Sequence, residues 1–281
     1  MLASVAQGLA LRTQRIASAS ATGWLLGMAG VALSPPNGGA TYPGGKHAAA
    51  CVSLDFDVTK ESRADANHKG THLLLYCAER YGIPLTWAIC GMTVEQDPEP
   101  FEAVMSSGGN HEIASHTYSH LRVDAATPAE LEADMEKWRS VVGELNPTTF
   151  VFPYNRMGNF ETLRRLGFAS YRGEVRRVGA PLAENGFCNI APVMYLSGRS
   201  GGTVATAKMF IDLCIRYRSV FHLWSHPWSL SREGDPTEYS RLVLEPIFEY
   251  LKQKQDEGLL ELCTMNQLAQ SVQNLQMAQP S

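Results

Sequence analysis

Two aspartates alternate with apolar residues in the stretch CVSLDFDVTK, residues 51–60. Because successive side chains of a strand point to opposite faces, Asp55 and Asp57 share one face with Ser53. Two ionised carboxylates on one side of a buried strand need a positive partner, and a divalent metal ion would supply it. The alternative is a strand that ends early, with both carboxylates in solvent, where they cap the next loop.

A pair of histidines lies in HEIASHTYSH, residues 111–120. His116 and His120 are four residues apart, so both imidazoles share one face if residues 116–120 form a helical turn. Two imidazoles and a carboxylate are a donor set that borderline divalent metals prefer. The spacing therefore predicts a metal site, whereas His111, taken alone, is more simply a structural histidine.

A third histidine ends the apolar run of FHLWSHPWSL, residues 221–230. Strand alternation places His222, Trp224 and His226 on one face. An imidazole beside an aromatic wall suits a general acid whose pKa is tuned by its surroundings. The structural alternative is a histidine at a strand end that is bonded to a backbone carbonyl.

A proline interrupts the strand-like stretch FVFPYNR, residues 150–156. Pro153 frees the amides of Tyr154 and Asn155 from the strand ladder, so that they can hold a developing oxyanion. A proline at this point can also do no more than end the strand.

These residues follow a regular alternation of strands and helices. Strands are predicted at 48–58, 84–91, 111–116, 148–154, 169–173, 219–226 and 259–265. Helices are predicted between them and after the last strand, while residues 173–204 are interpreted as irregular. This order indicates an α/β fold with a mostly parallel sheet, in which chemistry gathers at the carboxyl ends of the strands.

Composition narrows the class of protein. The chain has 281 residues, 44% of them hydrophobic and 19% charged, with a net charge of −4, so we expect a soluble enzyme that binds no nucleic acid. Its six cysteines form no C-x-x-C pair and lie mostly in apolar segments. Buried thiols of this kind indicate a reduced compartment, and hence a cytoplasmic protein.

The N-terminal segment, residues 1–45, is distinct from the domain predicted at 46–281. It contains the apolar run GWLLGMAGVAL at 23–33 and the Pro/Gly-rich linker SPPNGGATYPGG at 34–45. The apolar run is too short to span a bilayer as a helix, but it suits a signal-peptide core. We favour retention of the segment as a helix, in contact with the domain or with a membrane surface through residues 1–33, over export.

The ordered set SLDFDV, HEIASHTYSH, FVFPYN and HLWSHP resembles the polysaccharide deacetylase (NodB-homology) family of carbohydrate esterases, over about residues 47–270. The resemblance implies a distorted (β/α) barrel of about seven strands and a single divalent metal ion. It also implies hydrolysis of an N-acetyl group from an amino sugar in a polysaccharide or glycan precursor, which would be the protein's substrate.

The resemblance also assigns roles. His116 and His120 match metal ligands, and Asp55 matches the catalytic base. The family's second aspartate normally follows directly, where this chain has Phe56, but members with a D-x-D pattern make Asp57 the third ligand. Zinc is the default ion for such a set, with nickel, cobalt or manganese as alternatives.

The remaining roles concern the substrate. Tyr154 matches an oxyanion donor through its backbone N–H, and His226 matches the acid that protonates the leaving amine. The chain departs from the family at Val151, where an arginine is usual, and Arg156 is our candidate for the missing charge. The family's Asp/Trp motif has no clear counterpart in residues 173–204. The predicted substrate-binding residues are Tyr154, Asn155, Arg156 and Trp224.

Three other functions remain open from the sequence. The absent arginine makes a metal-dependent hydrolase of a small amide or cyclic imide the main alternative. A non-catalytic carbohydrate-binding relative is another, although no predicted ligand or catalytic group is missing. The sequence GRSGG at 198–202 also fits the G-x-S-x-G pattern of a serine hydrolase, with Ser200 as the nucleophile.

Overall fold

The computed structural model describes residues 32–33, 42–58, 60, 63–143, 145–173, 177–184, 186–197, 203–230 and 237–277. Most of the N-terminal segment, including its proposed membrane contact, and the GRSGG stretch with Ser200 lie outside these residues. Within the described ranges, no helix has the length and apolar character needed to cross a membrane.

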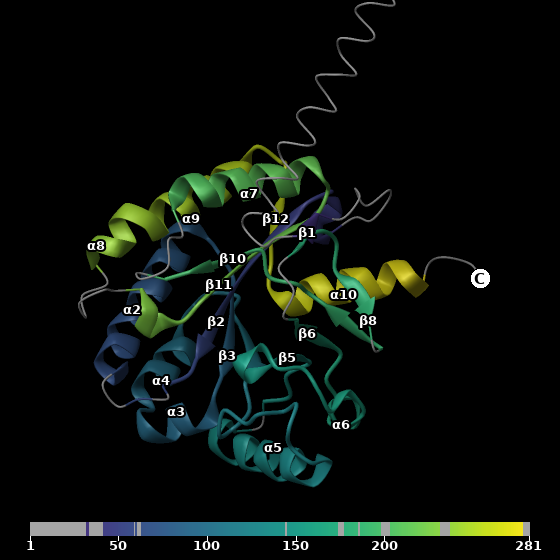
Figure 1. The fold of residues 1–281 in the computed structure, drawn as a ribbon. Coiled ribbons are helices and arrows are strands. Elements are labelled where there is room, and N and C mark those ends of the chain that lie inside the picture. Colours follow the sequence, from purple (N-terminus) through teal and green to yellow (C-terminus); the bar gives the residue numbers. More distant parts are fainter. Residues whose placement is uncertain are drawn as a thin grey trace, which may run out of the picture.

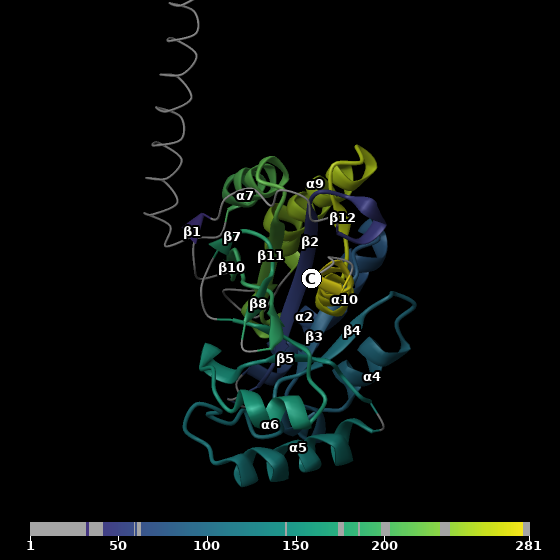
Figure 2. The ribbon, with the colours of Figure 1, turned by 90° about the vertical axis from the view of Figure 1, so that its right-hand side faces the viewer.

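A curled mixed sheet organises the domain (Figures 1 and 2). Its order is β10-β11-β2-β3-β4-β5-β6-β9-β8, with β12 paired to the beginning of β2. All pairs are parallel except β8–β9. Because β10 and β8 are not paired with each other, the sheet forms an open half-barrel, as expected for the predicted distorted (β/α) barrel.

All seven predicted strands are present. They are β2 (Ala49–Phe56), β3 (Leu85–Ile89), β4 (Glu112–Ser115), β5 (Thr149–Val151), β6 (Ser170–Arg172), β11 (Val220–Ser225) and β12 (Glu261–Leu262). The prediction of irregular structure at 173–204 is wrong for the described part of that segment. It contains β7 (Arg177–Val178), β8 (Leu182–Glu184), β9 (Phe187–Asn189) and β10 (Met194–Leu196), and β7 pairs with β1 (Ala32–Leu33).

Helices connect and cover the strands. They are α2 (Ala64–Tyr81), α3 (Gly91–Gln96), α4 (Glu99–Ser106), α5 (Pro128–Val142), α6 (Phe160–Arg165), α7 (Val204–Arg216), α8 (Thr237–Tyr239), α9 (Glu245–Asp256) and α10 (Met265–Met277). Helix α5 begins at a reciprocal capping box that Thr127 and Glu130 form. Helix α2 ends at Gly82, which adopts the left-handed conformation (φ 64°) that glycine tolerates best.

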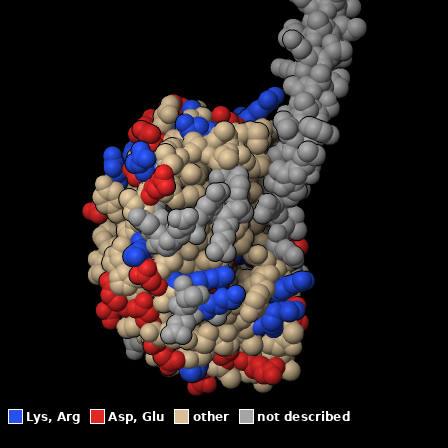
Figure 3. All heavy atoms as spheres, turned by 60° about the vertical axis from the view of Figure 1, so that its left-hand side comes forward, with Lys and Arg blue, Asp and Glu red and all other residues tan. Residues whose placement is uncertain are grey.

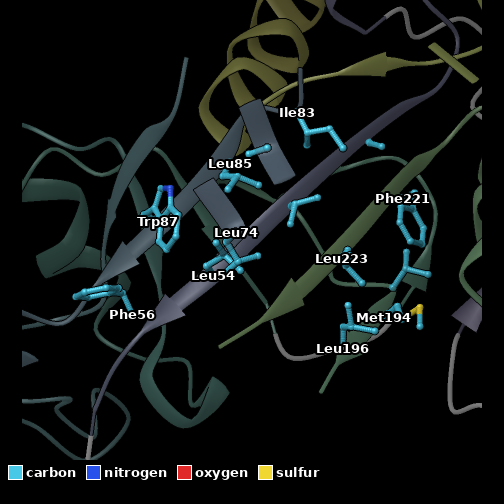
Figure 4. Packing of buried hydrophobic residues seen from close by; sticks show 14 of the residues in the cluster. Leu54, Phe56, Leu74, Ile83, Leu85, Trp87, Met194, Leu196, Phe221 and Leu223 are labelled. Carbon is cyan, nitrogen blue, oxygen red and sulfur yellow. The ribbon is translucent and has the colours of Figure 1, made fainter. Parts of the chain in front are cut away.

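The two faces of β2 pack against different layers. Leu54 and Phe56 face the outer helices, where they join a large apolar cluster with Leu74 of α2 and Trp87 of β3 (Figure 4). Ala49 and Cys51 face the inside of the half-barrel and pack in the cluster that contains Met265 and Leu268 of α10. This inner face continues toward the carboxyl end of β2, where its residues become polar.

The six cysteines are free thiols, and all six are buried. Burial raises the pKa of the Cys188 and Cys214 thiols to about 12 each. The thiols are therefore protonated and behave as small apolar core residues. On the face shown in Figure 3, acidic and basic side chains both occur among the coloured atoms, and they form no continuous basic surface.

Candidate active site

The inner face of β2 ends in a buried carboxylate that is paired with an arginine. Nη1 and Nη2 of Arg172, at the end of β6, donate hydrogen bonds of 2.5 and 2.6 Å to the two carboxylate oxygens of Asp55. Burial by itself raises the pKa of Asp55, but the Arg172 and His116 side chains outweigh it, and the net pKa is lowered. Asp55 is therefore an ionised carboxylate with fixed orientation.

Arg172 was not among the predicted site residues. We expected Arg156 to replace the arginine missing at Val151, but Arg156 is exposed, and the buried guanidinium beside Asp55 comes from the next strand. Nη1 of Arg172 also lies 3.3 Å from the hydroxyl of Ser53. The prediction that Arg156 supplies the positive charge of the site is thus wrong, because Arg172 supplies it.

Asp57, His116 and His120 form a buried cluster whose potential ligand atoms all lie within 4.8 Å of one another. Nε2 of His120 is 3.1 Å from Oδ2 of Asp57, and Nε2 of His116 is 4.0 Å from the same oxygen. For Asp57, the effect of burial is outweighed by the His120 hydrogen bond and the other imidazoles, and its pKa is lowered. The cluster therefore presents one anionic oxygen and two imidazoles to a common point.

The hydrogen bonding of His116 fixes which nitrogen faces that point. Nδ1 lies 2.8 Å from the carbonyl oxygen of Val151, which can only accept, so Nδ1 carries the proton. Nε2 is buried and has no hydrogen-bond partner among the described residues. Burial lowers the pKa of His116 to about 4, which keeps the imidazole neutral. A neutral nitrogen with a free lone pair, oriented by a backbone carbonyl, fits a metal ligand.

The loop that carries the histidines is not the helical turn that their spacing suggested. Residues 116–120 are irregular, and Thr117 and His120 have φ values of 63° and 57°. Asp134 of α5 holds the loop by accepting hydrogen bonds of 2.6 Å from the Tyr118 amide and 3.1 Å from the Ser119 amide. The two imidazoles still meet, with ring centroids 5.0 Å apart.

His226 lies directly after β11 and faces both aspartates. Its Nε2 is 3.9 Å from Oδ2 of Asp55 and 3.7 Å from Oδ1 of Asp57, and its Nδ1 is 3.1 Å from the Tyr195 hydroxyl. Burial lowers the pKa of His226, and the two carboxylates oppose this shift. The imidazole is thus fixed beside the cluster by an aromatic hydroxyl.

Trp228 is a second residue that the sequence interpretation missed. It lies in the 3-10 turn η4 (Pro227–Ser229), and its Nε1 donates a hydrogen bond of 3.0 Å to Oδ1 of Asp57. Its ring lies 4.5 Å from the ring of His226. The side chain of Arg63 packs on the Trp228 ring, with its guanidinium carbon 3.7 Å from the ring centroid. The tryptophan orients a carboxylate and an imidazole together.

Three of the four predicted substrate-binding residues, Tyr154, Asn155 and Trp224, contact residues of the same site. Tyr154 is 57% exposed and adopts φ 59°, and its ring lies 4.3 Å from that of His120. Trp224 lies beneath the guanidinium of Arg172 at 4.3 Å. We expected the backbone N–H of Asn155 to be free, but it donates a hydrogen bond to the carbonyl of Phe152. The Asn155 side chain instead accepts from Arg172 at 3.4 Å.

A family model described as polysaccharide deacetylase matches residues 44–170, a span that holds Asp55 and all three residues of the cluster. Over this span the chain resembles the polysaccharide deacetylase family. Arg172 and His226 lie beyond the matched span and are brought to the family's site by the sheet.

A peptidoglycan deacetylase of Helicobacter pylori is 30% identical over 108 residues, which are 37% of this chain and 36% of that protein. The match thus spans about a third of that relative's length. A Mycobacterium smegmatis structure described as a polysaccharide deacetylase has a TM-score of 0.66 at 18% identity, with 89% of this chain and 99% of that chain covered. A Puue allantoinase has a TM-score of 0.61 at 15% identity, with 84% and 93% covered. At these identities the structural likeness concerns the half-barrel fold.

Proposed function

We propose that this protein is a metal-dependent hydrolase that removes an N-acetyl group from an amino sugar in a polysaccharide or glycan precursor. The observation that carries the proposal is the unpartnered Nε2 of His116 in a buried cluster with Asp57 and His120, next to an ionised Asp55. The match of residues 44–170 to the polysaccharide deacetylase model and the peptidoglycan deacetylase among the relatives support the choice of an acetylated sugar.

Asp57, His116 and His120 would hold the metal ion, with zinc as the expected ion and nickel, cobalt or manganese as alternatives. When bound, the ion supplies a Lewis acid that polarises the amide carbonyl and lowers the pKa of water. Nδ1 of His116 stays protonated on the carbonyl of Val151 and so keeps Nε2 available as a ligand.

Asp55 would act as the general base. Its lowered pKa keeps it ionised and able to accept a proton from the attacking water, and Arg172 prevents it from rotating away. His226, 3.9 Å from Asp55, would donate a proton to the departing amine. The Tyr154 backbone N–H would bind the developing oxyanion, and its exposed ring would contact the sugar.

Acetate release from N-acetylated oligosaccharides and from peptidoglycan, by zinc-loaded protein, tests this proposal. We expect turnover that a chelator abolishes and zinc restores. Asp55→Asn should lower kcat by at least about 100-fold with metal content unchanged, because it removes the base and no ligand. His120→Ala should lose both metal and activity, and normal turnover in that variant would refute the assignment.

A small cyclic amide is the second candidate substrate. The structural likeness to an allantoinase motivates it, while the replacement of the missing family arginine by Arg172 weakens the original reason for it. Hydrolysis of allantoin and related cyclic amides, measured beside the acetylated sugars on one zinc-loaded preparation, separates the two. Turnover of the cyclic amide alone would favour this second function.

A further inference from the structure

A second cluster of metal-binding side chains lies at the surface between α2 and α4. His68 and His72 are one helical turn apart on α2, and Glu99 lies in the first turn of α4. Nε2 of His68 is 3.1 Å from Oε2 of Glu99, and Nε2 of His72 is 3.0 Å from Oε1. The potential ligand atoms of the three residues all lie within 4.8 Å of one another.

The spacing of these atoms suits one small cation. Zinc holds nitrogen and oxygen ligands at about 2.0–2.2 Å in a tetrahedron, so neighbouring donor atoms are about 3.3 Å apart. The two Nε2-to-oxygen distances at Glu99 are close to that value. Two histidines four positions apart on one helix, together with a carboxylate from another element, form an established type of zinc site.

The surroundings of the cluster also match a metal site. Oδ2 of Asp97 lies 4.0 Å from Nδ1 of His68, the ring nitrogen that does not face Glu99. When Nε2 of a histidine binds a metal, Nδ1 carries the proton, and a carboxylate that accepts it orients the ring; Asp97 lies on the correct side of His68 but beyond hydrogen-bond distance. The side chains of His68, His72 and Glu99 are 42%, 46% and 49% exposed, which leaves room for water as a fourth ligand.

We propose that His68, His72 and Glu99 bind a second divalent metal ion of the zinc class, which fastens α2 to α4. A Cβ atom at Gly70 of α2 would lie 2.1 Å from the carbonyl oxygen of Pro227, so another face of the same helix contacts the turn that carries Trp228. The ion therefore fixes helix α2, which packs against the turn that carries Trp228, and it does not touch the active site itself.

Metal content measured on metal-free protein dialysed against zinc tests the proposal. Wild-type protein should bind about two equivalents, and both His68→Ala/His72→Ala and His116→Ala/His120→Ala should bind about one. The variant with all four changes should bind none. Glu99→Gln, which keeps the size but removes the charge, should weaken the second site by at least about tenfold.

Exposed His47 offers a matched control, and His47→Ala should still bind about two equivalents. Zinc should raise the thermal midpoint of His116→Ala/His120→Ala but not that of the fourfold variant. This difference would show that the folded protein holds the ion at His68, His72 and Glu99. The proposal is overturned if His68→Ala/His72→Ala binds as much zinc as wild type, or if His116→Ala/His120→Ala binds none. Failure of the active-site proposal gives a different result, namely no loss of zinc in His116→Ala/His120→Ala.

Discussion

The buried pair of Asp55 and Arg172 offers the sharpest test of how the site is held. Arg172→Met removes the guanidinium, which lies 4.3 Å from the Trp224 ring centroid, and keeps an apolar side chain in its place. The Asp55 side chain, 5% exposed, is then left without its two short charge-assisted hydrogen bonds. We expect a large loss of stability, because a buried charge that loses its partner keeps its desolvation cost.

The magnitude follows from those two bonds. Hydrogen bonds to charged groups contribute about 1.5–3 kcal/mol each, and breaking a buried ion pair costs about 3–5 kcal/mol. In a domain of this size such a loss lowers the thermal midpoint by roughly 10 °C. Arg172→Lys should restore only part of it, since an ammonium cannot donate to both carboxylate oxygens in the same planar geometry.

The assay is urea unfolding of metal-free Arg172→Met, Asp55→Asn and the double variant. Removal of both charges relieves the penalty that each single change creates, so the double variant should be more stable than the sum of the two losses predicts. We expect a coupling free energy of about 2–3 kcal/mol. A coupling below about 0.5 kcal/mol would refute the view that this pair holds the base in place.

Three further predictions concern the surroundings of the site. Gly70→Ala should destabilise the protein by about 1–3 kcal/mol in urea unfolding, because its methyl group meets the backbone of η4, whereas Gly108→Ala, in open space, should not. Burial and then Arg172 lower the pKa of His222 to about 3 in the folded protein, whereas histidine in the unfolded chain has a pKa of about 6.5. The unfolded chain therefore binds the proton first, and the His222 contribution to the unfolding free energy is complete above about pH 6.5 and is lost as the pH falls toward 3. The wild-type unfolding free energy should therefore fall more steeply below pH 6.5 than that of His222→Gln, and parallel curves would contradict this. Trp228→Phe should weaken zinc binding at the active site by about 10–100-fold in a competition titration, because it removes the hydrogen bond to Asp57, and unchanged affinity would exclude that role.

The cluster of Asp57, His116 and His120 could be predicted because its signals are local. Asp55 and Asp57 share a face by strand alternation, and His116 and His120 follow the carboxyl end of β4, which is separated from β2 by β3 alone. The seven main strands were equally readable from their apolar runs. The short strands β8, β9 and β10 were not, since each has only three residues and a weak pattern.

Arg172 and Trp228 could not be predicted from the same signals. Arg172 is 117 positions from Asp55, and Trp228 is 171 positions from Asp57. Arg172 reaches Asp55 because the sheet curls between β2 and β6, whereas Trp228 reaches Asp57 because β11 pairs with β2, and no short stretch of sequence records either arrangement. The shape of the histidine loop was missed for a different reason. Its spacing suits a helical turn, but the hydrogen bonds to Asp134 hold it in an irregular conformation.

The burial of all six thiols affects how zinc shifts the equilibrium between the folded and the unfolded protein. In the native protein, only histidines and carboxylates compete for zinc. Unfolding releases six soft sulfur ligands at once, and zinc binds thiolates tightly. Excess zinc then stabilises the unfolded chain as well, so the gain in stability per equivalent should diminish as the zinc concentration rises. Slow refolding of zinc-crosslinked chains would follow, and a chelator added before cooling should restore reversibility.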